Sequence, residues 1–160
     1  MSMSKPQRVS LFILRITMGW MYLYAGISHI LDTTFSSAKY IGEAKSFVYL
    51  FQWFSNPQVL PVVDFMVKWG MTLLGVSLLL GLFVRISSYL GMLLMFLLYL
   101  PLLNFPMVGT NSYLVNQHII YISGLLLLAT CRAGHIWGVE KWLVNLPIFS
   151  RYPKLRALIN

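Results

Sequence analysis

Charged residues are scarce in this sequence: they make up 10% of its 160 residues, while 58% are hydrophobic. A soluble domain of this length usually carries about a quarter of its residues as charges. This shortage excludes a globule covered by water and leaves lipid to cover much of the surface. Because one helical span needs about 20 apolar residues, the chain has room for four spans in a single domain over residues 1–160.

Cysteine and acidic residues are also in short supply. The single Cys131 excludes an internal disulfide and a C-x-x-C dithiol. The first apolar run is long enough to span and has no clear small-residue cleavage site, which argues against a cleavable signal. Four acidic residues against twelve basic ones give a net charge of +8. The basic residues stand beside apolar runs, where they favour contacts with anionic lipid over nucleic acid.

Four apolar runs, at about 9–31, 60–84, 86–103 and 113–130, each have close to the length that a bilayer requires. They predict helices, because lipid offers no partner for free backbone groups. We therefore expect an all-α integral membrane four-helix bundle. Two basic residues, Lys39 and Lys45, lie on one side of such a bundle. Eight lie on the other side: Lys5, Arg8, Arg85, Arg132, Lys141, Arg151, Lys154 and Arg156.

The positive-inside rule then predicts that both termini are cytoplasmic, in a multi-pass protein of the cell (inner) membrane. The second and third spans should meet in a tight turn around Arg85. The outer loop, 32–59, is rich in aromatic residues, which is typical of an interfacial anchor or of a wall over a binding site. The tail, 132–160, is expected to lie as an amphipathic segment on the inner membrane surface.

Polar residues inside apolar spans are costly and therefore informative. In the first span, Arg15, Gly19, Tyr22, Gly26 and His29 are spaced four, three, four and three residues apart, which places them on one helical face. The two glycines predict a close approach of another helix backbone. Arg15 either projects from this seam or extends its side chain to the cytoplasmic interface.

The predicted topology gathers polar residues from separate spans at the outer end of the bundle. Asp64 and Lys68 stand four residues apart, a favourable order for an ion pair within a helix. The full set at this end is His29, Asp64, Lys68, Tyr99, Asn104, Asn116, Gln117 and His118. We expect a polar pocket that opens to the outer face under the aromatic loop.

Such a pocket suits a quinone headgroup, which needs hydrogen-bond donors, a route for protons and apolar walls. The candidate residues fall into three groups: catalytic His29, Lys68 and His118; cofactor-binding Arg15, Tyr22, Tyr99 and Tyr121; and substrate-binding Asp64, Asn116 and Gln117. A haem held by two histidines is the rival, disfavoured because both histidines lie near helix ends. No metal site is expected, because zinc would need more ligands. His135, in the tail, is expected to be solvated or to face lipid.

Four segments of the sequence (15–29, 69–85, 118–121 and 132–142) are together similar to the DoxX/DoxD family. The resemblance implies a four-helix membrane protein. The DoxD branch is the membrane subunit of thiosulfate:quinone oxidoreductase, which oxidises thiosulfate to tetrathionate and reduces quinone. Relatives often have Lys at position 29 and acids near 68, 116 and 117, so the pocket of this chain is more positive and suits an anionic substrate.

Two functions therefore stand against each other. One is a membrane subunit of a quinone-linked oxidoreductase, with lipid, quinone and a second subunit or another copy of the chain as partners. The other is a non-catalytic scaffold or assembly subunit of a redox complex, for which the glycine seam and basic tail matter and the pocket residues do not. A transporter is disfavoured, because it would normally show broken helices or paired repeats.

Overall fold

The computed structural model describes residues 3–109 and 112–143. Its four longest helices are α1 (Lys5–Leu31), α4 (Leu60–Leu80), α5 (Val84–Tyr99) and α6 (Gln117–Thr130). The short helical elements are α2 (Ala38–Gly42), α3 (Val48–Phe54), η1 (Leu100–Leu102), η2 (Ala133–His135) and α7 (Val139–Leu143). Strands β1 (Leu103–Asn104), β2 (Met107–Val108) and β3 (Ser112–Tyr113) form a small antiparallel sheet in that order.

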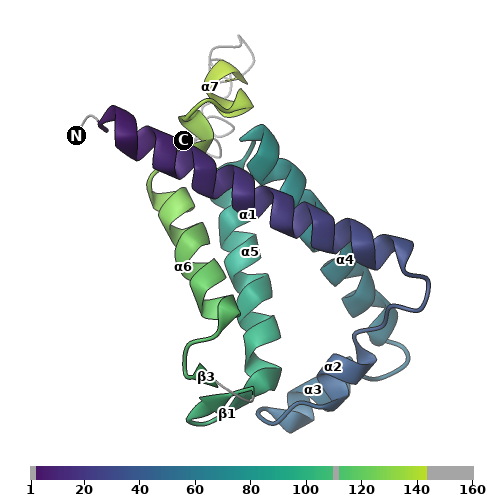
Figure 1. The fold of residues 1–160 in the computed structure, drawn as a ribbon. Coiled ribbons are helices and arrows are strands. Elements are labelled where there is room, and N and C mark those ends of the chain that lie inside the picture. The colour runs from purple at the N-terminus through teal and green to yellow at the C-terminus, as the bar shows by residue number, and fades with distance from the viewer. Residues whose placement is uncertain (1–2, 110–111, 144–160) are drawn as a thin grey trace.

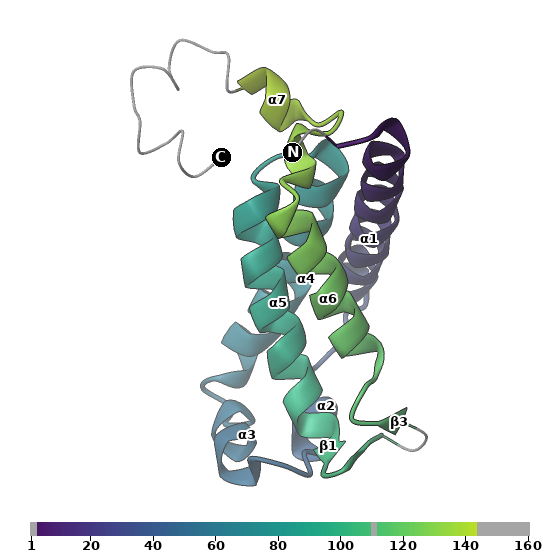
Figure 2. The same ribbon diagram turned by 90° about the vertical axis from the view of Figure 1, so that its left-hand side faces the viewer.

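The long helices form two closely packed pairs. α1 packs along α4, and α6 packs along α5, while the pairs meet mainly where α4 contacts α5 (Figures 1 and 2). One end of the molecule, here called the loop end, carries α2, α3 and the small sheet. The start of α1, the α4–α5 turn and α7 lie at the opposite end, here called the terminal end. The predicted all-α architecture is thus confirmed as mostly helical, with uneven packing between the helices.

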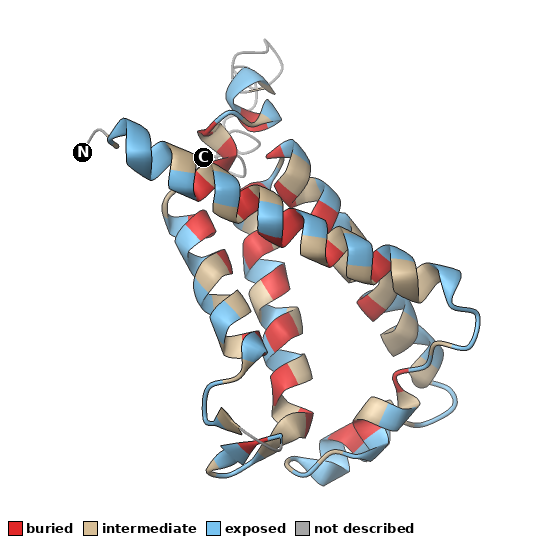
Figure 3. Cartoon of the chain, in the orientation of Figure 1, coloured by how far each residue is buried: buried red, intermediate tan, exposed pale blue. Residues whose placement is uncertain are grey.

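Three helical segments are long and apolar enough to cross a membrane: Lys5–Leu31, Leu60–Leu80 and Val84–Leu102. Many of their large apolar residues are exposed. The buried residues lie mainly where the helices face one another (Figure 3). Trp20 and Leu90, for example, are each 62% exposed. An apolar surface of this extent suits contact with lipid rather than water.

The fourth apolar helix is shorter than the sequence predicts. α6 has 14 residues and a length of about 21 Å, whereas the apolar run predicted a span from 113 to 130. The helix begins late because Asn116 has extended backbone and caps it with its side chain. Residues 112–113 pair instead as strand β3.

Among the connections between the long helices, one agrees with the sequence prediction and two contain elements that were not predicted. The tight turn predicted around Arg85 is present, because α4 ends at Leu80 and α5 begins at Val84. Gly81 ends α4 with a φ of 66°, a left-handed conformation that glycine adopts without steric cost. The outer loop contains α2 and α3, and the small sheet after α5 was not predicted. Of the predicted tail, residues 144–160 lie outside the described residues.

The glycine seam predicted on the first helix is confirmed at the α1–α4 contact. A Cβ atom placed on Gly26 would lie 2.5 Å from the backbone nitrogen of Thr72 on α4. A Cβ on Gly75 of α4 would lie 2.6 Å from the Cα of Leu23 on α1. The two helix backbones are therefore in direct contact, in a way that only residues without a side chain permit.

We expect Gly75→Ala to destabilise the protein by about 1–3 kcal/mol, because a methyl group there meets the backbone of α1. Thermal unfolding in detergent measures this as a fall of several degrees in Tm. Gly70→Ala is the matched control on the same helix, since its Cβ would meet only Leu94 Cδ2 at an ordinary 3.6 Å. Equal Tm values for the two variants would contradict the role assigned to the seam.

Candidate functional site

The loop end holds a cavity of about 410 Å³, within the size range of small-molecule sites. Its wall comes from the end of α1, from α2 to α5, and from the start of α6, which converge at this end of the fold (Figure 1). Most lining side chains are apolar, as at Met66, Val67 and Leu94. The polar lining residues are His29, Ser36, Ser37, Tyr40, Gln117 and His118. Two histidines from different helices thus share one apolar cavity.

The aromatic residues of the outer loop divide between two environments. Tyr40, Phe51 and Phe54 line the cavity, and Phe51 is buried. Tyr49 and Trp53 point outward and are 89% and 59% exposed. The loop therefore supplies both a wall for the cavity and outward aromatic side chains of the kind that anchor proteins at membrane interfaces.

The predicted ion pair between Asp64 and Lys68 is not formed. Asp64 Oδ1 instead accepts a hydrogen bond of 2.7 Å from the backbone nitrogen of Ser37, the residue that precedes α2. Lys68 turns toward the segment between α1 and α2, where its Nζ lies 5.1 Å from the centre of the Phe35 ring. Asp64 thus fixes the loop on α4, which leaves the ammonium group of Lys68 to interact with an aromatic face.

Phe35 links Lys68 to His29. The Phe35 and His29 rings have centres 4.1 Å apart, and both residues line the cavity. Asp32 lies nearby, and hydrogen bonds from the hydroxyl and backbone nitrogen of Thr34 lower the pKa of its carboxyl, with a smaller contribution from Lys68. Where α1 ends, Lys68 and His29 therefore lie near an ionised carboxylate, and of these residues His29 lines the cavity.

Tyr40 anchors α2 to α5. Its hydroxyl donates to the backbone carbonyl of Leu98, and burial raises the pKa of the phenol to about 12. A pKa so far above neutral keeps the phenol protonated at physiological pH. Tyr40 is therefore a neutral part of the wall and does not serve as a base.

The start of α6 forms the opposite wall. His118 is 8% exposed and lines the cavity together with Gln117. Asn116 lies just before the helix, where its side chain accepts hydrogen bonds from the backbone nitrogens of His118 and Ile119. Asn116 thus supports the wall through its contact with His118.

The three predicted cofactor tyrosines lie away from the cavity wall. Tyr22 of α1 is buried and packs edge-on against Tyr121 of α6, with ring centres 6.1 Å apart. Tyr99, also buried, donates a hydrogen bond of 2.8 Å to the carbonyl of Leu114. The Tyr99 hydroxyl is satisfied by the protein, whereas the buried Tyr22 hydroxyl has no hydrogen-bond partner among the described residues. The roles of the three tyrosines as cofactor ligands stay predictions.

Arg15, the fourth predicted cofactor residue, lies at the terminal end, far along α1 from His29. Its side chain is 1% exposed, so it does not extend to the interface. Nη1 donates to the carbonyls of Ala133 and Ile136 at 2.5 and 3.0 Å, and Nη2 donates to that of Trp137 at 3.5 Å. These carbonyls come from the turn after α6 and provide hydrogen-bond acceptors for the guanidinium group inside the protein.

Glu140 lies close enough to Arg15 for their charges to interact. It was not among the predicted site residues. Its side chain is 2% exposed, and its backbone nitrogen donates to the carbonyl of Gly81. His135, expected to be solvated or lipid-facing, lies with Nδ1 3.5 Å from Glu140 Oε2. Burial raises the pKa of Glu140 to about 7, and the positive charge of Arg15 opposes this rise.

Gly134 and Gly138 provide the space for this cluster. A Cβ on Gly134 would collide with the Glu140 carboxylate, and one on Gly138 would lie 2.9 Å from Arg15 Nη1. The sequence contained a signal for this arrangement, since Arg15 is the only charge in the first span and Glu140 follows two closely spaced glycines.

Glu140 should make stability depend on pH. The pKa is above its ordinary value of 4.5, so the folded chain holds the proton more tightly than the unfolded chain. The protonated carboxyl of Glu140 thereby contributes about 3 kcal/mol to the free energy of unfolding. This contribution is complete below about pH 4.5 and is lost as the pH rises to about 7. Between pH 5 and 7 the Tm of the wild type should fall more than that of Glu140→Gln.

The histidines also titrate in this range, but they are present in both proteins, so the difference between the two pH profiles isolates Glu140. Parallel profiles would show that the carboxyl is not held protonated by burial.

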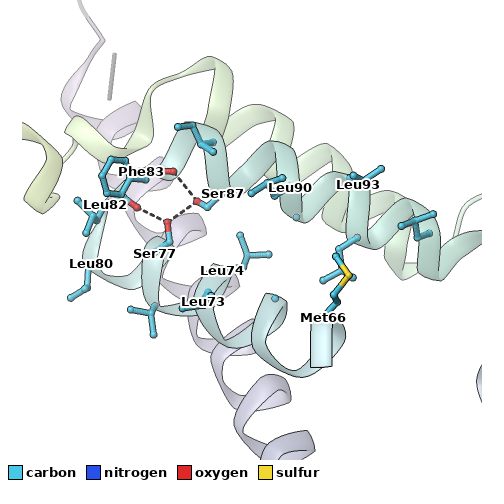
Figure 4. Close-up of a pocket in the computed structure, with 16 residues that line it drawn as sticks. Met66, Leu73, Leu74, Ser77, Leu80, Leu82, Phe83, Ser87, Leu90 and Leu93 are labelled. Atoms are coloured by element: carbon cyan, nitrogen blue, oxygen red, sulfur yellow. Dashed lines mark hydrogen bonds between the residues drawn. The ribbon is translucent and has the colours of Figure 1, made fainter. Parts of the chain in front are cut away.

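A second hollow, of about 540 Å³, lies between α4 and α5 (Figure 4). Leucines such as Leu73, Leu90 and Leu93 line it, and its two serines interact with protein atoms. The Ser77 and Ser87 hydroxyl oxygens lie 2.6 Å apart, and Ser77 Oγ also donates to the carbonyl of Leu82. Since these hydroxyls are engaged, the hollow is an apolar groove of the kind that lipid chains fill.

Among residues 3–109 and 112–143, no group of three or more His, Cys, Asp or Glu side chains is arranged to hold a metal ion. The wall of the loop-end cavity has both polar and apolar parts. Its two histidines and one nearby lysine are the groups with chemistry to offer.

These features define a mostly helical membrane protein with a mixed apolar and polar cavity at one end. The sequence model of the DoxX family matches residues 10–102, and the chain belongs to this family. The match runs from α1 through η1 and includes His29, Asp64 and Lys68, whereas His118 lies beyond it. No curated protein matches the chain, and no solved structure matches it.

Proposed function

We propose that this DoxX-family protein is the membrane subunit of a quinone-linked oxidoreductase and that the loop-end cavity binds the quinone headgroup. The observation that carries the proposal is the presence of His29 and His118, from two different helices, in the wall of one mainly apolar cavity. The resemblance to the thiosulfate:quinone oxidoreductase subunit supports the same function.

The residues present fit a quinone. Phe51, Phe54 and Met66 offer apolar contacts for a ring and for the start of a prenyl tail. His29 and His118 can donate or accept a hydrogen bond and can exchange protons near neutral pH. A bound quinone would supply the ability to accept two electrons, while the chain binds it, orients it and limits access of water.

Lys68 and His29 are the proposed contacts for an anionic electron donor such as thiosulfate. The Lys68 ammonium group lies 5.1 Å from the centre of the Phe35 ring, and this ring packs against His29, so both proposed contacts adjoin one residue of the cavity wall. With one cysteine in the whole chain, no internal dithiol can carry the electrons. The electrons must therefore come from a small substrate or from a partner subunit.

In the proposed orientation, the loop end faces the outer side of the cell membrane and the terminal end faces the cytoplasm. Basic residues of the described elements support it, since Lys5, Arg8, Arg85, Arg132 and Lys141 belong to segments at the terminal end (Figure 1). In this arrangement α6 is the fourth span, and its short length is made up by the strand segment before it and the turn after it.

Replacing His29, Lys68 or His118 with Ala should lower thiosulfate-dependent reduction of a quinone analogue by about 100-fold in membranes, because each replacement removes a proton donor or a charge. His135→Ala and Lys39→Ala are the matched controls, from the terminal end and the exposed surface of α2. Unchanged turnover in all three site variants would contradict the oxidoreductase proposal and favour a scaffold.

Protein purified in mild detergent should carry a prenylquinone, detected by mass spectrometry after solvent extraction. His29→Ala and His118→Ala should lower its occupancy, whereas His135→Ala should not, because His135 lies at the other end of the fold. A Soret absorption band in place of a quinone would identify a haem protein and overturn the proposal.

A further inference from the structure

The amide of Asn116 has a defined orientation. Asn116 precedes α6 with φ −123° and ψ −175°, and its Oδ1 accepts from the backbone nitrogens of His118 at 3.0 Å and Ile119 at 3.4 Å. Both backbone groups can only donate, so the atom that faces them must be the carbonyl oxygen. An exchanged amide would direct its NH₂ group at two N–H groups. The capping bonds therefore identify the other end of the side chain as the NH₂ group.

This NH₂ group determines which ring nitrogen of His118 carries the proton. Asn116 Nδ2 lies 3.1 Å from His118 Nδ1. Because Nδ2 has only hydrogens to offer, Nδ1 must accept the hydrogen bond through its lone pair. A neutral imidazole with an accepting Nδ1 carries its proton on Nε2.

His118 Nε2 is left accessible by the surrounding protein. The His118 ring lies in the cavity wall, and its Nε2 forms no hydrogen bond within the described part of the chain. Nε2 is also not fully buried, so neighbouring atoms do not close it off. The group presented to a ligand is thus an N–H donor.

We propose that Asn116 is a positioning residue that holds His118 in the Nε2–H tautomer, so that the site selects a ligand with a hydrogen-bond acceptor, such as a carbonyl oxygen. The quinone part of this inference rests on the proposed function, and the tautomer does not. A protonated Nε2 and an engaged Nδ1 leave His118 no free lone pair for iron, which disfavours haem ligation at this residue.

Asn116→Asp tests the inference directly. One carboxylate oxygen keeps the cap of α6, while the other can only accept, so it draws a proton onto His118 Nδ1. In protein labelled with ¹⁵N-histidine, in detergent at pH 8 and without ligand, NMR should show wild-type His118 protonated at Nε2 alone. In Asn116→Asp, Nδ1 should be protonated. The signals of His118 are those missing from His118→Gln.

Asn116→Ser is the control, because serine caps the helix but is too short to contact the ring. It should give a mixture of the two tautomers with an intact helix. Wild-type His118 protonated at Nδ1, or found as an even mixture, would overturn the inference whether or not a quinone binds.

Binding of a short-chain ubiquinone provides the second measurement. Loss of the directed N–H donor in Asn116→Asp should weaken binding by about tenfold, while Asn116→Ser should show a smaller loss. Equal affinity of wild type and Asn116→Asp would overturn the donor role of His118. Failure of wild type to bind the quinone, with the Nε2–H tautomer present, would instead overturn the proposed function and the ligand class together.

Discussion

The direct contact between the backbones of α1 and α4 determines how the loop end is assembled. Gly26 lies against Thr72, and this contact fixes the position of α1 along the axis of α4. Because the helices are antiparallel, one turn onward on α1 corresponds to one turn back on α4. His29 and Lys68 occupy these positions, and both lie close to the Phe35 ring. A bulkier residue in the seam would separate the helices and the groups that they carry.

The same contact extends to the wall of the cavity. Asp64 lies one further turn back on α4, where its carboxylate holds the backbone nitrogen of Ser37. Ser37 directly precedes α2, and the Tyr40 hydroxyl of α2 donates to the carbonyl of Leu98 on α5. Two hydrogen bonds thus attach the loop to both helix pairs, one to α4 and one to α5. The cavity exists because this loop closes over the space between the two pairs.

The two ends of the fold use polar residues in different ways. At the terminal end, Arg15 is surrounded by backbone carbonyls, and Glu140 is buried close to it, so the polar groups serve the packing of the chain. At the loop end, the histidine rings lie in a wall that leaves open volume. The hydrogen bonds from the Arg15 guanidinium group to carbonyls favour a structural role, although Arg15 Nε and Glu140 Oε1 have no hydrogen-bond partner among the described residues. A polar group at a cavity remains available to a ligand.

Several features followed from the sequence alone, because they depend on composition or on the period of one helix. The scarcity of charge indicated a membrane protein, and the spacing of Gly19 and Gly26 indicated a backbone contact. The tight turn near Arg85 followed from two adjacent apolar runs. In each case the signal is local, since a helix places residues three or four apart on one face whatever surrounds it.

Only the tertiary structure decided which partner each polar residue takes. Arg15 bonds carbonyls more than 100 residues away, and Asp64 bonds Ser37 rather than its helical neighbour Lys68. Hydropathy extended the fourth span to residue 113, but the cap formed by Asn116 starts the helix at Gln117. Which aromatic residues of the loop turn inward was likewise undetermined. Such choices depend on distances between segments remote in sequence, and no pattern within one segment contains those distances.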